Sequence, residues 1–455
     1  MSICKMTGIR NQIIISACMY TGQLLLGFNT AWTGPIITKL RDLEQSPLPY
    51  LLTETEISLI ASLMYVGAVP GPYIIGWLSN VKGRKPCLIL GGFISIVSYV
   101  LLAAANNLAM LYIGRIFGGL GIGTIALVNL VYIGEIASTP IRGVLLTVVG
   151  IFTTLGAILL FAVGPFFSYR VSTYVGLGLA VIFTLSTLMI PESPIFYILR
   201  DDEDGLVKSL QILGRLDDKK KLYDVKDEFK SGDTKMDWIE LFTLKTNRRA
   251  LIIGVTINIF QHTSGVMAVL FFSGDIFEMA GSSINSDISM IIIGGFQLFG
   301  SLVASVFIEK YGRKTLLIIS TLTCSISMLS LGLYFYLDNV QQLGIENVAW
   351  LPLVILIIFF IGYDSGLGII PIVLIGEMFT SNVRSKGSAV ALTFAWIAGF
   401  LISTAFGILV ENFGGHAAFW LFSCSSACAF LFTVFFIPET KGKSLLEIQK
   451  YLNKS

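Results

Sequence analysis

Two ionisable side chains, His262 and Asp364, fall inside long apolar runs of the sequence. Ionisable residues are costly within a membrane, so their presence there indicates a functional role. Histidine titrates near neutral pH, and the two groups together could relay a proton. Two other roles stay open: His262 as a neutral hydrogen-bonding group, and Asp364 as a member of a network of paired charges. A metal site is not indicated, because no cluster of ligating residues accompanies His262.

The rest of the chain shows no pattern typical of enzymatic catalysis. The six cysteines have no paired spacing suited to a structural metal, and Cys424 and Cys428 lie at helical spacing within an apolar run. No nucleophile–base arrangement emerges, and no Gly-x-x-x-x-Gly-Lys-Ser/Thr phosphate loop occurs. We therefore expect neither an enzyme nor a bound cofactor.

Charged residues recur in short motifs that occur twice in the same order. A tight basic turn, Gly-Arg-Lys, appears in each half of the chain, and a Glu seven residues before an Arg follows it. Each set ends in a Pro-Glu motif. Three motif pairs at similar offsets indicate an internal duplication. Measured at Arg84 and Arg313, Arg142 and Arg384, and Pro191 and Pro438, the offsets are 229, 242 and 247 residues.

The composition indicates a membrane protein. Hydrophobic residues make up 54% of the 455 residues and charged residues 13%, with a mean hydropathy of +0.79. Soluble domains carry about 25% charged residues, so most of this surface must face lipid. Each apolar run is about twice as long as a barrel strand, which predicts helices. The expected spans are 12–36, 56–79, 86–105, 109–131, 143–166, 171–190, 250–273, 287–308, 314–336, 349–374, 386–410 and 415–437.

The fold class expected from these runs is an all-α membrane protein with twelve transmembrane helices in two related halves. The expected divisions are an N-terminal six-helix bundle (1–191), a cytoplasmic linker with short helices (192–249), a C-terminal six-helix bundle (250–440) and a short cytoplasmic tail (441–455). Within the linker, Leu206 and Leu210, and then Val225 and Phe229, indicate short amphipathic helices. The linker is either a tether or a latch on the cytoplasmic side.

The distribution of Lys and Arg predicts the orientation. Most of them fall on one side of the expected membrane, and the positive-inside rule therefore places both termini in the cytoplasm. The cations on this side are Lys5, Arg10, Lys82, Arg84, Lys85, Arg142, Lys310, Arg313, Lys314, Arg384, Lys386, Lys441, Lys443, Lys450 and Lys454.

Taken together, the ordered motifs resemble the sugar-porter family of the major facilitator superfamily over nearly the whole chain. Besides the paired motifs above, they include Tyr132-Ile133-Gly134-Glu135 and Phe260-Gln261-His262-Thr263-Ser264-Gly265. Within this family the sequence is most similar to the insect facilitated trehalose transporters. The resemblance implies two six-helix bundles, the major facilitator fold, that rock about a central substrate site.

The resemblance also implies roles for single residues. Charges at the cytoplasmic ends would form a gate whose acids and bases pair across the two halves when the inner side is closed. The expected substrate-binding residues are Gln261, His262, Gln297, Trp396 and Asp364, because amides and an aromatic face suit a neutral sugar. The expected gate residues are Arg84, Glu135, Arg142, Glu192, Glu309, Arg313, Glu377, Arg384 and Glu439.

Several positions depart from the family pattern. A polar position of span 5 is Gly150, the asparagine of span 7 is Met267, and the asparagine before the span 11 tryptophan is Ala395. Span 10 reads Gly366-Leu367-Gly368-Ile369-Ile370-Pro371, without two of the family's prolines and its tryptophan. A site built around sugar hydroxyls binds more weakly without such groups, which leaves the identity of the substrate open.

The resulting expectation is facilitative transport of a sugar, either trehalose or a hexose such as glucose, by alternating access at the plasma membrane. The alternatives are a non-transporting sugar sensor and a proton-coupled carrier of another polar solute. Against proton coupling, span 1 lacks the acid that proton-coupled sugar porters usually place there. The expected partners are a small-molecule sugar and the lipid bilayer, with no nucleic acid, and the protein is expected to work as a monomer.

Overall fold

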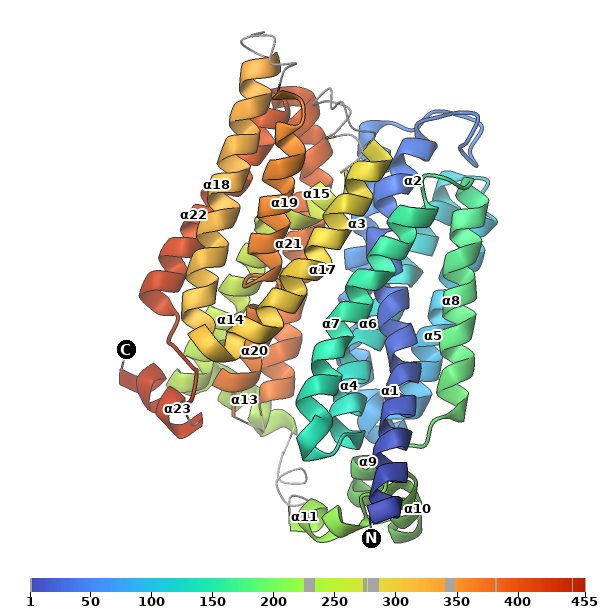
Figure 1. The fold of residues 1–455 in the computed structure, drawn as a ribbon, viewed down its shortest axis with the longest axis vertical. Coiled ribbons are helices and arrows are strands. Elements are labelled where there is room, and N and C mark those ends of the chain that lie inside the picture. Colours follow the sequence, from blue (N-terminus) through green and yellow to red (C-terminus); the bar gives the residue numbers. More distant parts are fainter. Residues whose placement is uncertain are drawn as a thin grey trace.

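The computed structural model describes residues 2–224, 234–272, 276, 286–339, 348–380, 383–443 and 445–454, and the regular elements in these ranges are helices (Figure 1). The N-terminal half contains α1 (Ser2–Ala31), α2 (Thr33–Leu40), α3 (Glu54–Ala68), α4 (Gly71–Lys82), α5 (Arg84–Ala103), α6 (Leu108–Ile136), α7 (Thr139–Val163) and α8 (Tyr169–Met189). The C-terminal half contains α14 (Lys245–Thr263), α15 (Val266–Phe271), α17 (Ser286–Tyr311), α18 (Arg313–Asn339), α19 (Leu351–Asp364), α20 (Ile370–Met378), α21 (Arg384–Phe413) and α22 (Gly415–Phe436). Between and after the halves lie α9 (Pro194–Leu199), α10 (Glu203–Leu213), η1 (Leu216–Asp218), α11 (Lys219–Asp224), α13 (Thr234–Thr243) and α23 (Leu445–Lys454).

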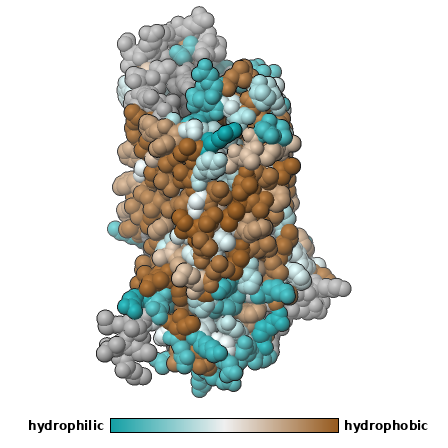
Figure 2. All heavy atoms as spheres, turned by 90° about the vertical axis from the view of Figure 1, so that its right-hand side faces the viewer, coloured by the Kyte–Doolittle hydropathy of each residue, from teal (hydrophilic) through white to brown (hydrophobic). Residues whose placement is uncertain are grey.

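The predicted fold class is confirmed. In the described ranges, eleven helical segments are long and apolar enough to cross a bilayer, and the shorter α19 followed by α20 accounts for the remaining predicted span. On the face that Figure 2 shows, apolar side chains cover the middle of the molecule, and polar side chains gather towards its two ends. Both termini lie at one end, together with α9, α10, α11, α13 and α23 (Figure 1).

The predicted span 349–374 is not one continuous helix. Between α19 and α20 the chain makes turns over 365–369. Gly366 lies so close to α18 that a Cβ would be 2.5 Å from the Ser320 Cβ, and the Ser320 hydroxyl accepts a hydrogen bond of 2.9 Å from the Leu367 N–H. The backbone N–H that leaves the helical pattern at this break therefore finds a hydrogen-bond partner inside the protein, which a membrane environment requires. Pro371 lies in the first turn of α20, where its missing N–H costs nothing.

Glycines allow the closest helix contacts within the N-terminal half. A Cβ on Gly27 of α1 would lie 1.7 Å from the Thr153 carbonyl oxygen of α7, and one on Gly156 of α7 would lie 2.0 Å from the Leu24 carbonyl oxygen of α1. Such pairs of small residues let two backbones approach each other in a membrane, where packing supplies much of the association energy. These contacts hold α1 and α7 together as one rigid unit of this half.

The first part of the linker packs beneath the N-terminal half. Leu206 and Leu210 are fully buried in a small apolar cluster, as the amphipathic pattern predicts. Gln12 of α1 donates a hydrogen bond of 2.7 Å to the Leu213 carbonyl at the end of α10. Arg215, in the following turn, donates one of 2.8 Å to the backbone carbonyl of Glu135. These contacts fasten α10 to the first part of α1 and to the end of α6.

The second part of the linker and the tail pack beneath the C-terminal half. Asp237 of α13 pairs with Lys386 at the start of α21, and Arg249 of α14 donates a hydrogen bond of 2.7 Å to the Leu452 carbonyl of α23. At this end of the molecule, α10 is thus fastened to the N-terminal half, and α13 and α23 are fastened to the C-terminal half. The predicted helical residues Val225 and Phe229 lie outside the described residues.

Candidate substrate site and charge clusters

The basic turn of the N-terminal half is organised by two carboxylates. The Glu192 carboxylate accepts hydrogen bonds from the backbone N–H groups of Arg84 (2.9 Å) and Lys85 (3.1 Å), and thereby caps the start of α5. Burial raises the pKa of the Glu192 carboxyl, while these N–H groups and the Arg84 charge oppose the rise. The Arg84 side chain binds Glu135 of α6, with Nη2 2.9 Å from Oε1 and Nε 3.0 Å from Oε2. The Ser193 hydroxyl also contacts the Glu135 carboxylate.

The C-terminal half repeats this arrangement contact by contact. The Glu439 carboxylate accepts from the N–H groups of Arg313 (3.0 Å) and Lys314 (3.1 Å) at the start of α18. Arg313 Nη2 lies 2.9 Å from Glu377 Oε1, and the Thr440 hydroxyl donates to Glu377 Oε2 at 2.5 Å. The duplication inferred from sequence therefore extends to single hydrogen bonds.

The pairing of gate charges across the halves stays a prediction for the state in which the inner side is closed. The ion pairs of Arg84 and Arg313 each join two helices of one half, because each basic turn lies beside the end of a neighbouring helix in that half. Arg142 and Arg384 are exposed, and each donates a hydrogen bond of 3.3 Å to a carbonyl five residues earlier. The side chain of Glu309 lies outside the described residues.

Gln261 lies at the break between α19 and α20. Its amide nitrogen donates a hydrogen bond of 3.0 Å to the Gly368 carbonyl. The residue is only half-buried. This places an amide group of α14 against the irregular backbone of span 10, which is the type of position where transporters bind substrates.

His262 lies one residue further along α14 and faces the other half of the protein. Its Nδ1 lies 3.1 Å from the Asn258 carbonyl oxygen, and its ring packs edge-on against Tyr65 of α3, with centroids 5.9 Å apart. A Cβ on Gly399 of α21 would lie within 2.9 Å of both rings. Gly399 therefore leaves the space in which an aromatic ring of the N-terminal half meets the histidine.

Asp364 is buried at the end of α19, with 8% of its surface exposed. It lies against Gly300 of α17, where a Cβ would be 3.2 Å from the Asp364 Cβ, and one carboxylate oxygen has no hydrogen-bond partner among the described residues. The clusters of Arg84 and Arg313 lie at the helix ends instead. The structure thus places Asp364 beside the break of span 10 and apart from both charge clusters.

Gln297 and Trp396 are half-buried on α17 and α21. The Gln297 amide oxygen is buried without a hydrogen-bond partner in the described structure, and Trp396 packs against the apolar core. Neither is hydrogen-bonded to Gln261 or His262 in the described residues. Of the predicted substrate residues, the structure brings together the adjacent Gln261 and His262, with Asp364 at the same helix break.

Arg115 is a buried cation that sequence analysis did not assign to any site. It is fully buried in α6, where its guanidinium donates to the Ile60 carbonyl (3.0 Å) and to the Asn29 side-chain oxygen (3.1 Å) and lies over the Trp32 ring. These contacts join α6 to α1 and α3. A lone Arg in an apolar run was the signal that could have marked it, because a charge within a span needs partners.

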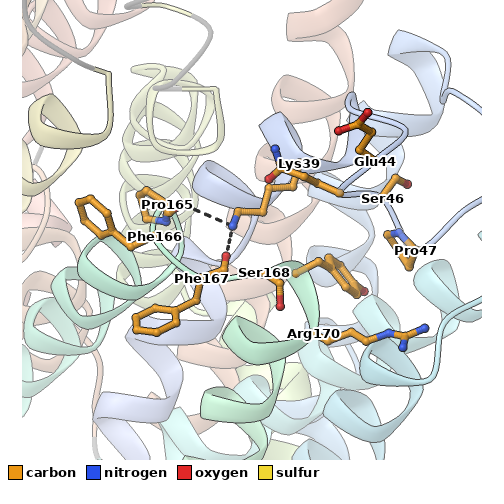
Figure 3. Close-up of a pocket in the computed structure, with 11 residues that line it drawn as sticks. Lys39, Glu44, Ser46, Pro47, Pro165, Phe166, Phe167, Ser168 and Arg170 are labelled. Atoms are coloured by element: carbon orange, nitrogen blue, oxygen red, sulfur yellow. Dashed lines mark hydrogen bonds between the residues drawn. The ribbon is translucent and has the colours of Figure 1, made fainter.

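A separate pocket of about 460 Å³ lies at the end of the molecule opposite the termini (Figure 3). The end of α2, the loop that follows and the turn before α8 form its walls. Lys39 is buried beside it and donates hydrogen bonds to the carbonyls of Pro165 and Phe167. None of the predicted substrate residues lines this pocket.

The repeated halves, the apolar middle of the molecule and the polar groups at a broken span are features of the major facilitator architecture. Residues 15–452 match the family described as Sugar (and other) transporter, and the chain belongs to this family.

Similar proteins include the facilitated trehalose transporters Tret1 of Polypedilum vanderplanki (31% identical, covering 97% of this chain and 88% of the relative) and of Anopheles gambiae (30%, 97% and 56%). The chain thus spans little more than half of the second relative. Among solved structures, the inward open conformation of the xylose transporter XylE from E. coli is similar at a TM-score of 0.79 (24% identity, 97% of this chain and 99% of that chain). The proton:xylose symporter XylE bound to 6-bromo-6-deoxy-D-glucose is similar at a TM-score of 0.78. It is 24% identical in sequence, and the match covers 98% of this chain and 100% of that chain. These structures support the fold.

Proposed function

We propose that this protein carries a neutral sugar, trehalose or a hexose such as glucose, down its gradient across the plasma membrane by alternating access. The observation that carries this proposal is the position of Gln261 and His262, where α14 meets both the break of span 10 and the opposite half. Amides, hydroxyls and aromatic rings are the groups that recognise a neutral polyhydroxylated ligand. The relatives named as facilitated trehalose transporters support the same substrate class.

The surroundings of Arg115 support a facilitative mechanism. Asn29, in span 1, offers it an amide oxygen at 3.1 Å, at a place where a carboxylate could take up and release a proton. An amide does not titrate, so this contact cannot couple sugar movement to a proton. Both termini are placed in the cytoplasm in this proposal, because they lie at the same end as the basic turns of Arg84 and Arg313. A single chain contains both halves, so the proposed working unit is the monomer.

Uptake of radiolabelled trehalose and glucose into oocytes that express the protein tests this proposal. The wild-type protein should show saturable uptake that is unchanged between acidic and neutral external pH. Gln261→Ala should lose most of the uptake, while Gln45→Ala, in the pocket away from span 10, should keep it. Absence of uptake of both sugars, with the protein present at the cell surface, would contradict sugar transport. Uptake that rises at acidic pH would contradict the facilitative mechanism.

A further inference from the structure

Tyr65 is the N-terminal residue that enters the space beside Gln261 and His262. It belongs to α3, whereas the rings it meets, His262 and Phe271, belong to the C-terminal half. The side chain is 4% exposed, and its hydroxyl has no hydrogen-bond partner among the described residues. A buried hydroxyl without a partner is unfavourable, so this state of the protein leaves a hydrogen-bonding group unused.

The neighbours of Tyr65 are groups that suit a sugar. A Cβ on Gly368, whose carbonyl accepts the hydrogen bond from the Gln261 amide, would lie 3.2 Å from the Tyr363 ring. The His262 ring stands edge-on to the Tyr65 ring, with an angle of 77° between the two ring planes. A phenol of the N-terminal half thus lies against an imidazole of the C-terminal half, which is next in sequence to the Gln261 amide.

Contacts on either side fix Tyr65 in this position. Towards the pocket end of α3, the Thr404 hydroxyl donates a hydrogen bond of 2.7 Å to the Ser62 hydroxyl. Towards the end where the termini lie, the hydroxyls of Tyr73 and Thr393 are 2.8 Å apart. Tyr65 therefore lies midway along a seam at which α3 and α4 run against α21.

We infer that Tyr65 is a substrate-contacting, specificity-determining residue, whose hydroxyl hydrogen-bonds the bound sugar together with Gln261 and His262. This inference rests on the proposed function. It supplies, from the N-terminal half, a polar group that Gly150, Met267 and Ala395 do not provide. The sugar gives the Tyr65 hydroxyl the hydrogen-bond partner that it lacks in the present arrangement.

The test compares Tyr65→Phe with Tyr99→Phe in uptake assays with trehalose and glucose. Both substitutions remove one buried hydroxyl without a described partner, but Tyr99 packs against Phe28 and Gly176 inside the N-terminal half. Tyr65→Phe should raise KM for the transported sugar about five- to tenfold, since one hydrogen bond to substrate is lost. Tyr99→Phe should leave KM unchanged. Surface expression, measured by biotinylation, separates folding from binding.

Monodeoxy analogues of the transported sugar give a second readout. The wild-type protein should discriminate against the analogue that lacks the hydroxyl bound by Tyr65, and Tyr65→Phe should treat this analogue and the parent sugar alike. An unchanged KM and unchanged discrimination in Tyr65→Phe, with wild-type uptake intact, would overturn the inference and leave sugar transport standing. If the wild-type protein transports neither sugar, the proposed function fails and the inference fails with it.

Discussion

Arg84 and Glu135 form an ion pair of 2.9 Å that joins α5 to α6 within one half of the protein. The side chains are 7% and 10% exposed, so both charges are largely removed from water. Loss of one member leaves the other buried and uncompensated. Such pairs act as joints inside each half, whereas Arg142 and Arg384 are exposed.

Glu135→Gln should therefore destabilise the protein by about 3–5 kcal/mol, the usual cost of removing one partner from a buried pair. The measurement is thermal unfolding of the detergent-solubilised protein, monitored by tryptophan fluorescence. Arg84→Met combined with Glu135→Leu removes both charges and should recover part of this loss. If the double variant loses as much stability as Arg84→Met and Glu135→Leu lose together when each is measured singly, the two residues do not act as a pair.

The equivalent substitution in the C-terminal half should cost less. Glu377 is 28% exposed beside Arg313, so water screens that pair more strongly. Glu377→Gln should destabilise by about 1 kcal/mol, the upper end for accessible pairs. The two variants, unfolded under identical conditions, give a direct comparison of the repeats. Equal losses would mean that burial does not decide the strength of the two joints.

Glu192 predicts a pH dependence of stability. Burial raises the pKa of this carboxyl in the folded state above its value in the unfolded chain. The folded state then binds the proton more tightly, so this group's contribution to stability rises as the pH falls from the folded pKa to the unfolded pKa. Relative to Glu192→Gln, which cannot titrate, the wild-type unfolding temperature should increase on mild acidification. A wild-type unfolding temperature that stays constant relative to Glu192→Gln, or that falls relative to it on acidification, contradicts this assignment.

The fold was largely predictable from sequence, and the reasons are physical. A bilayer requires long apolar helices, so the length of the apolar runs predicts the spans. Basic turns such as Gly83-Arg84-Lys85 must lie in water, and their recurrence in both halves indicates the duplication. The break at 365–369 was missed because the apolar run continues through it. Gly366 and Gly368 were visible, but their effect depends on the contact of Gly366 with Ser320 of a different helix.

The site was predictable only in part. Gln261 and His262 lie in a recognisable motif, whereas Tyr65 lies in an ordinary apolar run, and its role follows from the neighbouring ring of His262, about 200 residues away in sequence. The partners of Arg84 and Arg313 could not be assigned either. An acid and a base at the ends of helices carry no information in sequence about whether they pair within a half or between halves.

The hydrogen bond between Tyr73 and Thr393 joins the two halves near the end where the termini lie. It connects neutral groups, so its loss should change the balance between conformations by only about 0.5–1.5 kcal/mol. Tyr73→Phe should therefore change the maximal uptake rate a few-fold, with little effect on KM. Thr393→Val should have the same effect, and the double variant should add nothing further. Multiplied effects in the double variant would show that the two hydroxyls act independently.

Asn29→Asp tests whether the uncharged Asn29 amide beside Arg115 is the reason that sugar transport does not depend on a proton. The substitution places a carboxylate within hydrogen-bonding distance of the buried Arg115, where the wild-type amide oxygen lies at 3.1 Å. A buried carboxylate beside a buried guanidinium is close to neutral in net stability, so the variant should fold. Its charge, however, changes with protonation, and the packing of α1 against α6 then depends on pH. Sugar uptake by Asn29→Asp should become sensitive to external pH, whereas Asn29→Ser, which adds no titratable group, should stay as insensitive as the wild-type protein. Equal pH profiles for all three proteins would show that the contact between α1 and α6 does not control transport.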